Sequence, residues 1–435
     1  MSIKDFFRAS QVKCLLRAVT DARSMFAVNF SKTVRRTMKS LFLNRQRFIL
    51  CRSIAVFLLC NLNGFNVAWA ADKLKVEIVY FTQEKEVPAA LSNLDPFISD
   101  KGLQGAILGI KDNNTTGAFT GQEYILKETI VPLNGDVLAA YKKVLEQGNS
   151  MVVVNLPAEQ LLKISGLVQE SPLLFDVTTR DDSLRQKQCQ KNVFHLLPSR
   201  AMRADALAQY MLKKRWQQWF LVVGPEQQDR LFAAAVKRAA KRFGSKIVAE
   251  KVWDHTHDAR RTAQSEVPVF TQGVDYDVLV VADEQGLFGE YISYRTWKPR
   301  PVIGTQGLVP TSWHRTHEQW GAVQIQNRFK EQAGRWMEEE DYGAYLAIRA
   351  IGEAVTRTQS ADQKTIQEYL LSDRLALQGY KGRPLSFRSW NGQLRQPVLL
   401  AAARSMVAVA PIEGFLHPVT ELDTLGFDRP ETQCQ

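Results

Sequence analysis

The sequence lacks the motifs that mark most cofactor-dependent and hydrolytic enzymes. The first strongly apolar run, residues 76–81, is followed by TQEKEVPAAL and not by a glycine-rich phosphate loop, so a dinucleotide site has no support. GxxxxGK[ST], GxSxG and HEXXH are also absent. An enzyme is therefore the least favoured class, and the sequence predicts neither catalytic residues nor a cofactor.

Metal-binding and paired-carboxylate patterns are equally sparse. His255/His257 and His314/His317 have spacings that can chelate a metal, but no cysteine or acidic cluster accompanies them. We therefore expect no metal site. The four acids of MEEEDY (337–342) are interpreted as a solvated approach to a helix, where acidic residues suit the helix dipole. A catalytic pair is less favoured because neighbours on one turn do not face each other.

The N-terminal region has no apolar run long enough for a membrane anchor. Residues 53–70, SIAVFLLCNLNGFNVAWA, are uncharged but interrupted by asparagine and glycine, and a spanning helix needs about 20 apolar residues. Basic residues precede this stretch and Ala68-Trp69-Ala70 ends it, which is the signal-peptide pattern. We expect residues 1–70 to be a leader cleaved near Ala70. Residues 1–37, before Met38, are either an upstream mis-start or an extended basic region.

An excess of positive charge is missing from the body of the chain. The net charge is +11, but residues 1–70 hold 12 Lys and Arg against 2 acids, while residues 71–435 hold 44 against 43. A polyanion partner needs a basic face on the folded protein. Nucleic acid is therefore not an expected partner.

Cysteine is scarce. Of five cysteines, three fall in the leader (Cys14, Cys51 and Cys60), which leaves Cys189 and Cys434. Two cysteines in an exported chain suggest one disulfide. The alternative is two separate thiols.

The body does contain a regular alternation of buried-strand runs and helical patterns. Apolar strands linked by helical crossovers predict a parallel sheet covered on both faces. The pattern starts again near residue 200, and 365 residues exceed the size of one core, about 250–300 residues. We therefore predict an α/β fold of two doubly wound parallel-sheet lobes. The strand runs are 76–81, 124–131, 151–156, 172–177, 219–224, 246–253, 277–282 and 301–304, and helices are expected near 102–113, 137–145, 157–166, 200–215, 232–243, 341–355 and 362–372.

The C-terminal third adds a hairpin and several aromatic residues. Residues 382–403 read as a hairpin with Asn391-Gly392 as a tight turn. Eight tryptophans follow residue 200, and Trp297 and Trp313 fall on expected loops. In a cleft they would stack on a planar or apolar ligand. The alternative is that they fill cores.

Longer strings carry a resemblance to a known family. AYLAIRAIGEAV and KGRPLSFRSWNGQLRQPVLL resemble the type I periplasmic binding proteins, whose well-known members are the branched-chain amino-acid binders of ABC importers. LPSRAMRADALAQYM, RRTAQSEVPVFTQGVDYDVLVVADE, GTQGLVPTSWHRTHEQWGA and EGFLHPVTELDTLG resemble the subfamily associated with pyrroloquinoline quinone (PQQ)-dependent alcohol dehydrogenase systems. The resemblance covers residues of about 74–410.

This resemblance implies a periplasmic, monomeric solute-binding protein that closes on a small organic molecule and delivers it to ABC permease subunits. A ligand sensor or accessory protein of the alcohol-oxidation system, without transport, is the alternative. The resemblance also implies lobe boundaries and hinges. The first lobe is expected at 71–197 with 305–387, the second at 198–304 with 388–410, a tail at 411–435, and hinges at Leu197–Ser199, Thr305–Gly307 and Leu385–Arg388.

The family's ligand contacts carry over only in part. Amino-acid binders place a small hydroxyl residue after the third strand, where this chain has Asn155-Leu156-Pro157. The difference argues against an α-amino acid as the ligand. The expected ligand-binding residues are Thr178, Thr179 and Asp181 after the fourth strand run, Asp283 and Glu284 after residues 277–282, Gln306 after residues 301–304, and Trp297.

Overall fold

A computed structural model describes residues 73–87, 97–167, 172–253 and 259–434. Outside these ranges lie the expected leader with its cleavage site at Ala70, and Cys14, Cys51, Cys60, His255 and His257. No helix within the described ranges is long and apolar enough to cross a membrane.

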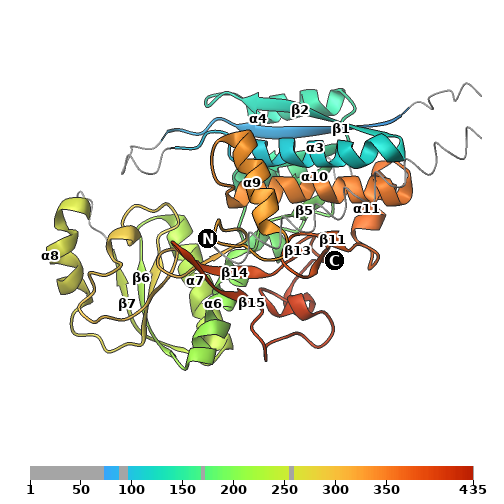
Figure 1. Ribbon diagram of the computed structural model, residues 1–435. Helices are drawn as coiled ribbons and strands as arrows, with labels where there is room; N and C mark the ends of the chain where they lie inside the picture. Colours follow the sequence, from blue (N-terminus) through green and yellow to red (C-terminus); the bar gives the residue numbers. More distant parts are fainter. Residues whose placement is uncertain (1–72, 88–96, 168–171, 254–258, 435) are drawn as a thin grey trace, which may run out of the picture. The chain divides into compact units, whose positions relative to one another are not determined.

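The first sheet has five parallel strands in the order β2-β1-β3-β4-β5. Figure 1 shows β1 and β2 side by side at one edge of this sheet. Its strands are β1 (Leu74–Gln83), β2 (Gln122–Val131), β3 (Met151–Asn155), β4 (Leu173–Asp176) and β5 (Val193–His195). The central strands are buried along their whole length, which is why they appear in the sequence as continuous apolar runs.

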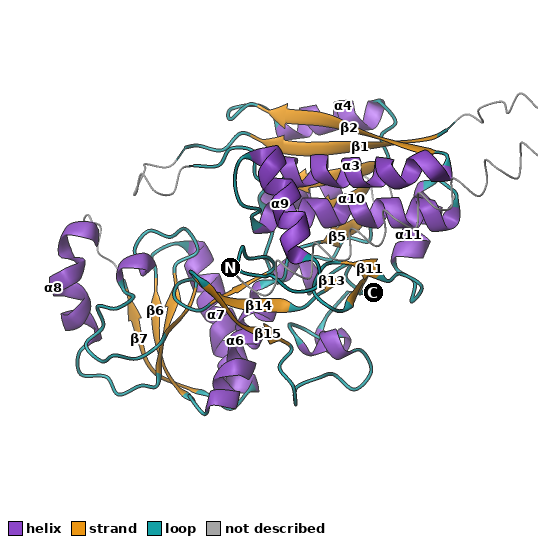
Figure 2. Cartoon of the chain, viewed as in Figure 1, coloured by secondary structure: helices purple, strands orange, loops and turns teal. Residues whose placement is uncertain are grey.

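Helices cover both faces of this sheet. One face packs on α3 (Leu103–Thr120) and α10 (Glu339–Thr358), which run alongside each other in Figure 2, and the other on α4 (Val137–Glu146) and α5 (Ala158–Ser165). Two further helices, α9 (Ala322–Ala333) and α11 (Gln363–Leu370), join the α3 and α10 side. The α/β layers predicted from the sequence are therefore confirmed.

The second sheet has four parallel strands in the order β7-β6-β8-β9. They are β6 (Gln218–Val223), β7 (Lys246–Val252), β8 (Val278–Ala282) and β9 (Val302–Gly304). The helices are α6 (Arg200–Lys214) and α7 (Gln227–Arg242) on one face and α8 (Ala259–Thr271) on the other. Each parallel sheet reverses its strand order beside its first strand, and ligands of such sheets bind at that edge, beyond the carboxyl ends of the strands.

The expected hairpin at 382–403 is only partly correct. β12 (Pro384–Phe387) pairs with β13 (Leu394–Arg395), so the Asn391-Gly392 dipeptide lies in a longer connection and not in a two-residue turn. The rest of the expected second strand is β14 (Val398–Ala402), which joins a different sheet. The remaining strands are β10 (Val309–Thr311) and β15 (Ser405–Ala410), which flank β14, and β11 (Leu377–Gln378), which pairs with β12.

Two hydrophobic cores define where the chain crosses between its halves. The first core, on the α3 and α10 face, draws on residues between 76 and 196 and between 313 and 394. The second core, on the α6 and α7 face, draws on residues between 202 and 303 and between 398 and 425. Residues 197–201, 304–312 and 395–397 lie between the stretches that belong to the two cores. The lobe bounds and hinges expected from the sequence stay predictions.

Candidate functional site

A cavity of about 260 Å³ lies where the loops after β4, β8 and β9 meet the starts of α6 and α10. Charged and amide side chains line it together with an apolar wall. The lining residues are Arg180, Arg203, Phe232, Asp283, Glu284, Gln285, Gly286, Gly304, Thr305, Gln306, Val309, Pro310 and Glu339. Arg180 and Glu339 belong to the half of the chain that contains the first sheet. Most of the other lining residues belong to the half that contains the second sheet.

Asp283 lines the cavity, but its carboxylate is already fully engaged. Oδ1 accepts a hydrogen bond from the Leu287 amide at 2.9 Å, and Oδ2 accepts from the amides of Phe288 at 2.9 Å and Gly289 at 2.6 Å. The side chain is 1% exposed. Asp283 therefore shapes the 284–289 loop and has no oxygen free for a ligand.

Glu284 is engaged as well. Both of its oxygens accept from the Arg200 guanidinium, at 2.5–3.0 Å, and Arg200 also pairs with Asp181 at 3.2 Å. Burial alone would lower the pKa of Arg200, but Glu284 and Asp181 raise it, so the guanidinium stays charged. This bidentate pair links the β8 loop, the start of α6 and the loop after β4.

Arg203 and Glu339 form a second ion pair among the lining residues. Arg203 donates to Glu339, and it also donates to the Pro310 carbonyl at 2.9 Å. Burial alone would raise the pKa of Glu339, but Arg203, Arg180 and the Thr311 hydroxyl lower it to about 2. Glu339 is thus a permanently ionised partner of Arg203.

The MEEEDY acids are consequently not the solvated approach that the sequence suggested. Glu339 is mostly buried at the cavity, and the Asp341 side chain is fully buried. Asp341 caps α10 with Glu338, accepts from the Gly102 amide at 2.8 Å and pairs with Arg335 at 2.6 Å. The acids suit the helix start, as expected, but neighbouring elements cover Glu339 and Asp341, while the Glu338 side chain stays 44% exposed.

Arg180 differs from the other charged residues of the cavity. Its guanidinium lies 3.7 Å from Glu339 and 3.8 Å from Glu340, beyond hydrogen-bond distance, and it makes no side-chain hydrogen bond to the described residues. Its Nε is buried without a partner. Burial alone would lower the pKa of Arg180, but these carboxylates raise it. Arg180 is a charged group with donors to spare.

Gln306 supplies an uncharged polar group. It follows β9, as expected, and its amide makes no hydrogen bond within the described part of the chain. Its stem packs so close to Gly289 that a Cβ there would lie 2.6 Å from the Gln306 Cγ. The glycine therefore makes room for Gln306 at the cavity.

The hydroxyl residues after β4 do not line the cavity. Thr178 donates to the Asn155 side chain at 2.5 Å, and the Thr179 hydroxyl donates to Asp176. Asn155 in turn donates to Tyr80 at 2.9 Å. Asn155 stands where amino-acid binders have a small hydroxyl residue. It is part of a hydrogen-bond network that joins the ends of β1, β3 and β4.

The structure does not place the two expected stacking tryptophans in the cavity. Trp297 is 57% exposed and is not a lining residue, and its backbone amide donates to the Thr271 hydroxyl. Trp313 is buried in the first core, where it stacks on Tyr342 with ring centroids 4.4 Å apart. Phe232 is the aromatic side chain that lines the cavity.

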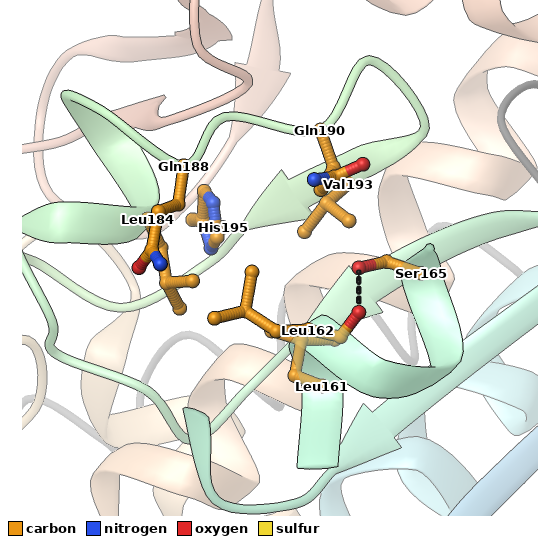
Figure 3. Close-up of a pocket in the computed structure, with 8 residues that line it drawn as sticks. All are labelled: Leu161, Leu162, Ser165, Leu184, Gln188, Gln190, Val193 and His195. Carbon is orange, nitrogen blue, oxygen red and sulfur yellow. Dashed lines mark hydrogen bonds between the residues drawn. The ribbon is translucent and has the colours of Figure 1, made fainter. Parts of the chain in front are cut away.

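A second, much smaller hollow lies beside His195 (Figure 3). Its volume is about 10 Å³, room for one water at most. Its walls include Leu161, Leu162 and Val193, and the Ser165 hydroxyl donates to the Leu162 carbonyl at its edge. This hollow is too small to be a ligand site.

His195 and its neighbours form a buried polar network near the first crossing. The His195 Nδ1 lies 2.7 Å from Asp176, and Arg185 donates to Gln393 at 2.8 Å and to the Thr179 carbonyl at 2.8 Å. Burial, together with the charge of Arg185, lowers the pKa of His195 to about 4.

His314 and His317, whose spacing could chelate a metal, instead contact nearby polar groups of the protein. His314 Nδ1 lies 2.7 Å from the Thr316 hydroxyl, and His317 Nε2 lies 2.7 Å from the Tyr380 carbonyl.

Cys189 and Cys434 are joined in a disulfide with their Cα atoms 5.6 Å apart. The Gln433 amide beside it donates to the Gln186 carbonyl at 2.8 Å. Among the described residues no group of three or more His, Cys, Asp or Glu is placed to hold a metal ion.

Sequence reasoning placed Asp283, Glu284 and Gln306 on the cavity but missed Arg180, Arg203 and Glu339. Arg180 stands between the expected Thr179 and Asp181, so its position was signalled, but its charge was passed over for the hydroxyls. Arg203 follows Arg200 by three residues, which puts both on one face of the helix after the first crossing. Glu339 stands in the MEEEDY stretch, whose acids were expected to be solvated.

Comparisons with known proteins agree with this architecture. A family model described as Periplasmic binding protein matches residues 102–285. No curated protein matches the chain. A branched-chain amino-acid ABC transporter periplasmic ligand-binding protein from Burkholderia xenovorans has a TM-score of 0.62 at 18% identity, covering 77% of this chain and 95% of its own.

Two other solved structures give the same result. A periplasmic binding protein from Burkholderia mallei has a TM-score of 0.60 at 15% identity, over 84% of this chain and 99% of its own. A leucine-, isoleucine-, valine-, threonine- and alanine-binding protein from Brucella ovis, in a closed conformation, has a TM-score of 0.58 at 14% identity, over 76% of this chain and 90% of its own. The chain has the fold of the type I periplasmic binding proteins, as the sequence predicts.

Proposed function

We propose that this protein is a periplasmic solute-binding protein of an ABC importer, which binds a small organic molecule and presents it to membrane permease subunits. The observation that carries the proposal is the cavity of about 260 Å³ whose walls come from both halves of the chain. Ligand sites in α/β folds lie beyond the carboxyl ends of strands, and this cavity follows β4, β8 and β9.

Closure of the two halves is the proposed mechanism. Three short connections join the cores, apart from the C-terminal segment, and hinges of this kind absorb a rotation in a few residues. A ligand favours closure only when it binds the closed arrangement more tightly than the open one. Arg180 lies on one side of the cavity and Gln306 on the other, so a ligand between them would contact both halves.

Export and the link to alcohol oxidation rest on the sequence. The basic, uncharged and small-residue segments before Ala71 support secretion to the periplasm, and the disulfide suits an oxidising compartment. The resemblance to the subfamily associated with PQQ-dependent alcohol dehydrogenase systems supports a place beside such a system. We further propose that the protein acts as a monomer and catalyses no reaction.

Native mass spectrometry of protein isolated from the periplasm tests the proposal. We expect a mature N-terminus near Ala71 and a co-purifying small molecule that raises the melting temperature when added back. A ligand at 100 times its Kd stabilises the folded state by about 2.7 kcal/mol. Protein found in the cytosol with residues 1–70 intact, and without a ligand, contradicts the proposal.

A ligand sensor without transport is the second candidate, because the same fold can serve as a receptor module. Pull-down from membranes separates the two functions. Permease subunits in the captured fraction support import. A kinase or a dehydrogenase, without permeases, supports the sensor.

A further inference from the structure

The geometry points to a ligand of one chemical class: a small organic acid without an ammonium group, whose carboxylate is held by Arg180. This inference rests on the proposed function and narrows it. It would separate the protein from the amino-acid binders that share its fold, because the buried ammonium group of an α-amino acid is best compensated by a free carboxylate in the cavity.

No lining carboxylate is free for that purpose. The cavity has three, and each is satisfied by the protein itself. Asp283 accepts three backbone amides, Glu284 is bidentate with Arg200, and Glu339 pairs with Arg203 and accepts from the Thr311 hydroxyl at 2.5 Å. An ammonium group beside these three carboxylates would have to displace a partner that each already has, and its desolvation is costly. Glu340, 3.8 Å from Arg180, is not a lining residue.

Arg180, in contrast to these carboxylates, has hydrogen-bond donors that no described residue satisfies. Its guanidinium is positively charged, its closest carboxylate oxygens lie at 3.7 and 3.8 Å, and its buried Nε has no partner. The planar fork of an arginine matches a carboxylate in a bidentate arrangement. A ligand carboxylate would therefore satisfy a group that the folded protein leaves without hydrogen bonds among its described residues, whereas a ligand ammonium would be repelled by it.

The rest of the cavity suits the remainder of such a molecule. The unpaired Gln306 amide can donate to or accept from a neutral oxygen on the ligand. Phe232, Val309 and Pro310 offer an apolar surface for a hydrocarbon portion. The volume of about 260 Å³ lies just below the usual range of about 300–1,000 Å³ for ligand pockets, so the acid is small.

Matched ligand pairs test this inference by titration calorimetry and thermal shift. Each pair shares a carbon skeleton and differs in the α-ammonium: 4-methylpentanoate against leucine, and 3-phenylpropanoate against phenylalanine. We expect the acids to bind and the amino acids to bind at least about tenfold more weakly. Arg180→Gln should weaken acid binding about 10- to 100-fold, the range for a lost charge-assisted hydrogen bond. Arg357→Gln, at an exposed pair with Glu353, should leave binding unchanged.

The outcomes separate this inference from the proposed function. Amino acids that bind as tightly as the matched acids overturn the inference and leave solute binding standing. Acid binding that survives Arg180→Gln with an unchanged melting temperature also overturns it. If neither member of any pair binds and no small molecule co-purifies, the proposed function itself fails.

Discussion

At the scale of single residues, His195 shows how burial sets a protonation state in this fold. Its imidazole is 2% exposed and lies 2.7 Å from Asp176, an arrangement that would favour protonation in water. Burial opposes the charged form more strongly, and Arg185, 3.7 Å from the same carboxylate, already supplies a positive charge. The neutral His195 therefore serves as a hydrogen-bond donor to Asp176.

A pH dependence of stability follows. The pKa of His195 is about 4 in the folded protein and about 6.5 when unfolded, so the unfolded chain binds more protons between these values. The contribution of His195 is fully present above about pH 6.5 and is lost as the pH falls toward 4. We expect His195→Gln to flatten this part of the pH profile of the free energy of unfolding, measured by urea denaturation.

The control for this experiment is Ser165→Ala, a non-titrating change at the edge of the same small hollow. It should lower stability by an amount that does not vary over pH 4–7. If His195→Gln and the wild-type protein keep parallel profiles over that interval, the buried-histidine account is wrong.

At the scale of elements, α3 and α10 approach each other through glycine. A Cβ on Gly105 would lie 1.8 Å from the Asp341 carbonyl oxygen, and a Cβ on Gly109 would lie 2.8 Å from the Ile348 Cβ. The apolar residues Leu103, Ala106, Ile107 and Ile110 share one face of α3 by their helical spacing, but of these only Ala106 is fully buried. The contact with α10 is made by glycines, which hydrophobic periodicity does not detect.

Gly105→Ala tests this contact. The added methyl meets backbone, which cannot rotate away, so α3 and α10 must separate at the helix starts. Overpacking of this kind costs about 1–3 kcal/mol, although alanine is otherwise the better helix former. We expect a lower urea midpoint for Gly105→Ala, and no loss for Thr116→Ala, an exposed change on the same helix. A midpoint equal to that of the wild type contradicts the close packing.

The central parallel strands β3, β4, β6 and β8 were predictable because they are buried on both faces and so form continuous apolar runs. β10 was not, because a strand of three residues carries no pattern and its partner β14 lies about 90 residues further along the sequence. The same limit applies to the site. The strand ends predict the positions of Asp283 and Gln306. Only the folded structure shows that backbone amides satisfy the Asp283 carboxylate and that the Arg180 guanidinium has no hydrogen-bond partner among the described residues.

At the scale of the whole described chain, the C-terminal segment after residue 410 connects the two cores. Ile412 and Leu425 belong to the second core. Asp423 accepts from Arg388 at 2.7 Å and from Arg395 at 2.9 Å, both on the β12–β13 side. The segment then ends in the disulfide beside the 183–190 loop.

A second anchor fixes this segment to α6 and α7. The Gly426 amide donates to Asp205 at 2.9 Å, and its carbonyl accepts from Arg238 at 2.8 Å and from Arg242 at 2.7 Å. Burial raises the pKa of Asp205 to about 6, against the lowering effect of both arginines. The tail is thus held by a buried carboxylate, several carbonyls and one covalent bond.

Removal of the disulfide separates the covalent from the non-covalent part of this attachment. The bond closes a loop with a sequence separation of 245, and loss of a native disulfide costs about 2–5 kcal/mol, chiefly by freeing the unfolded chain. Cys189→Ser with Cys434→Ser should therefore lower the urea midpoint, while the ion pairs of Asp423 keep the protein folded. Reduction of the wild-type protein should lower its midpoint equally and leave the variant unchanged. Two reactive thiols in the denatured, unreduced wild-type protein would show that the bond does not form, and the tail would then depend on the anchors at Asp423 and Gly426.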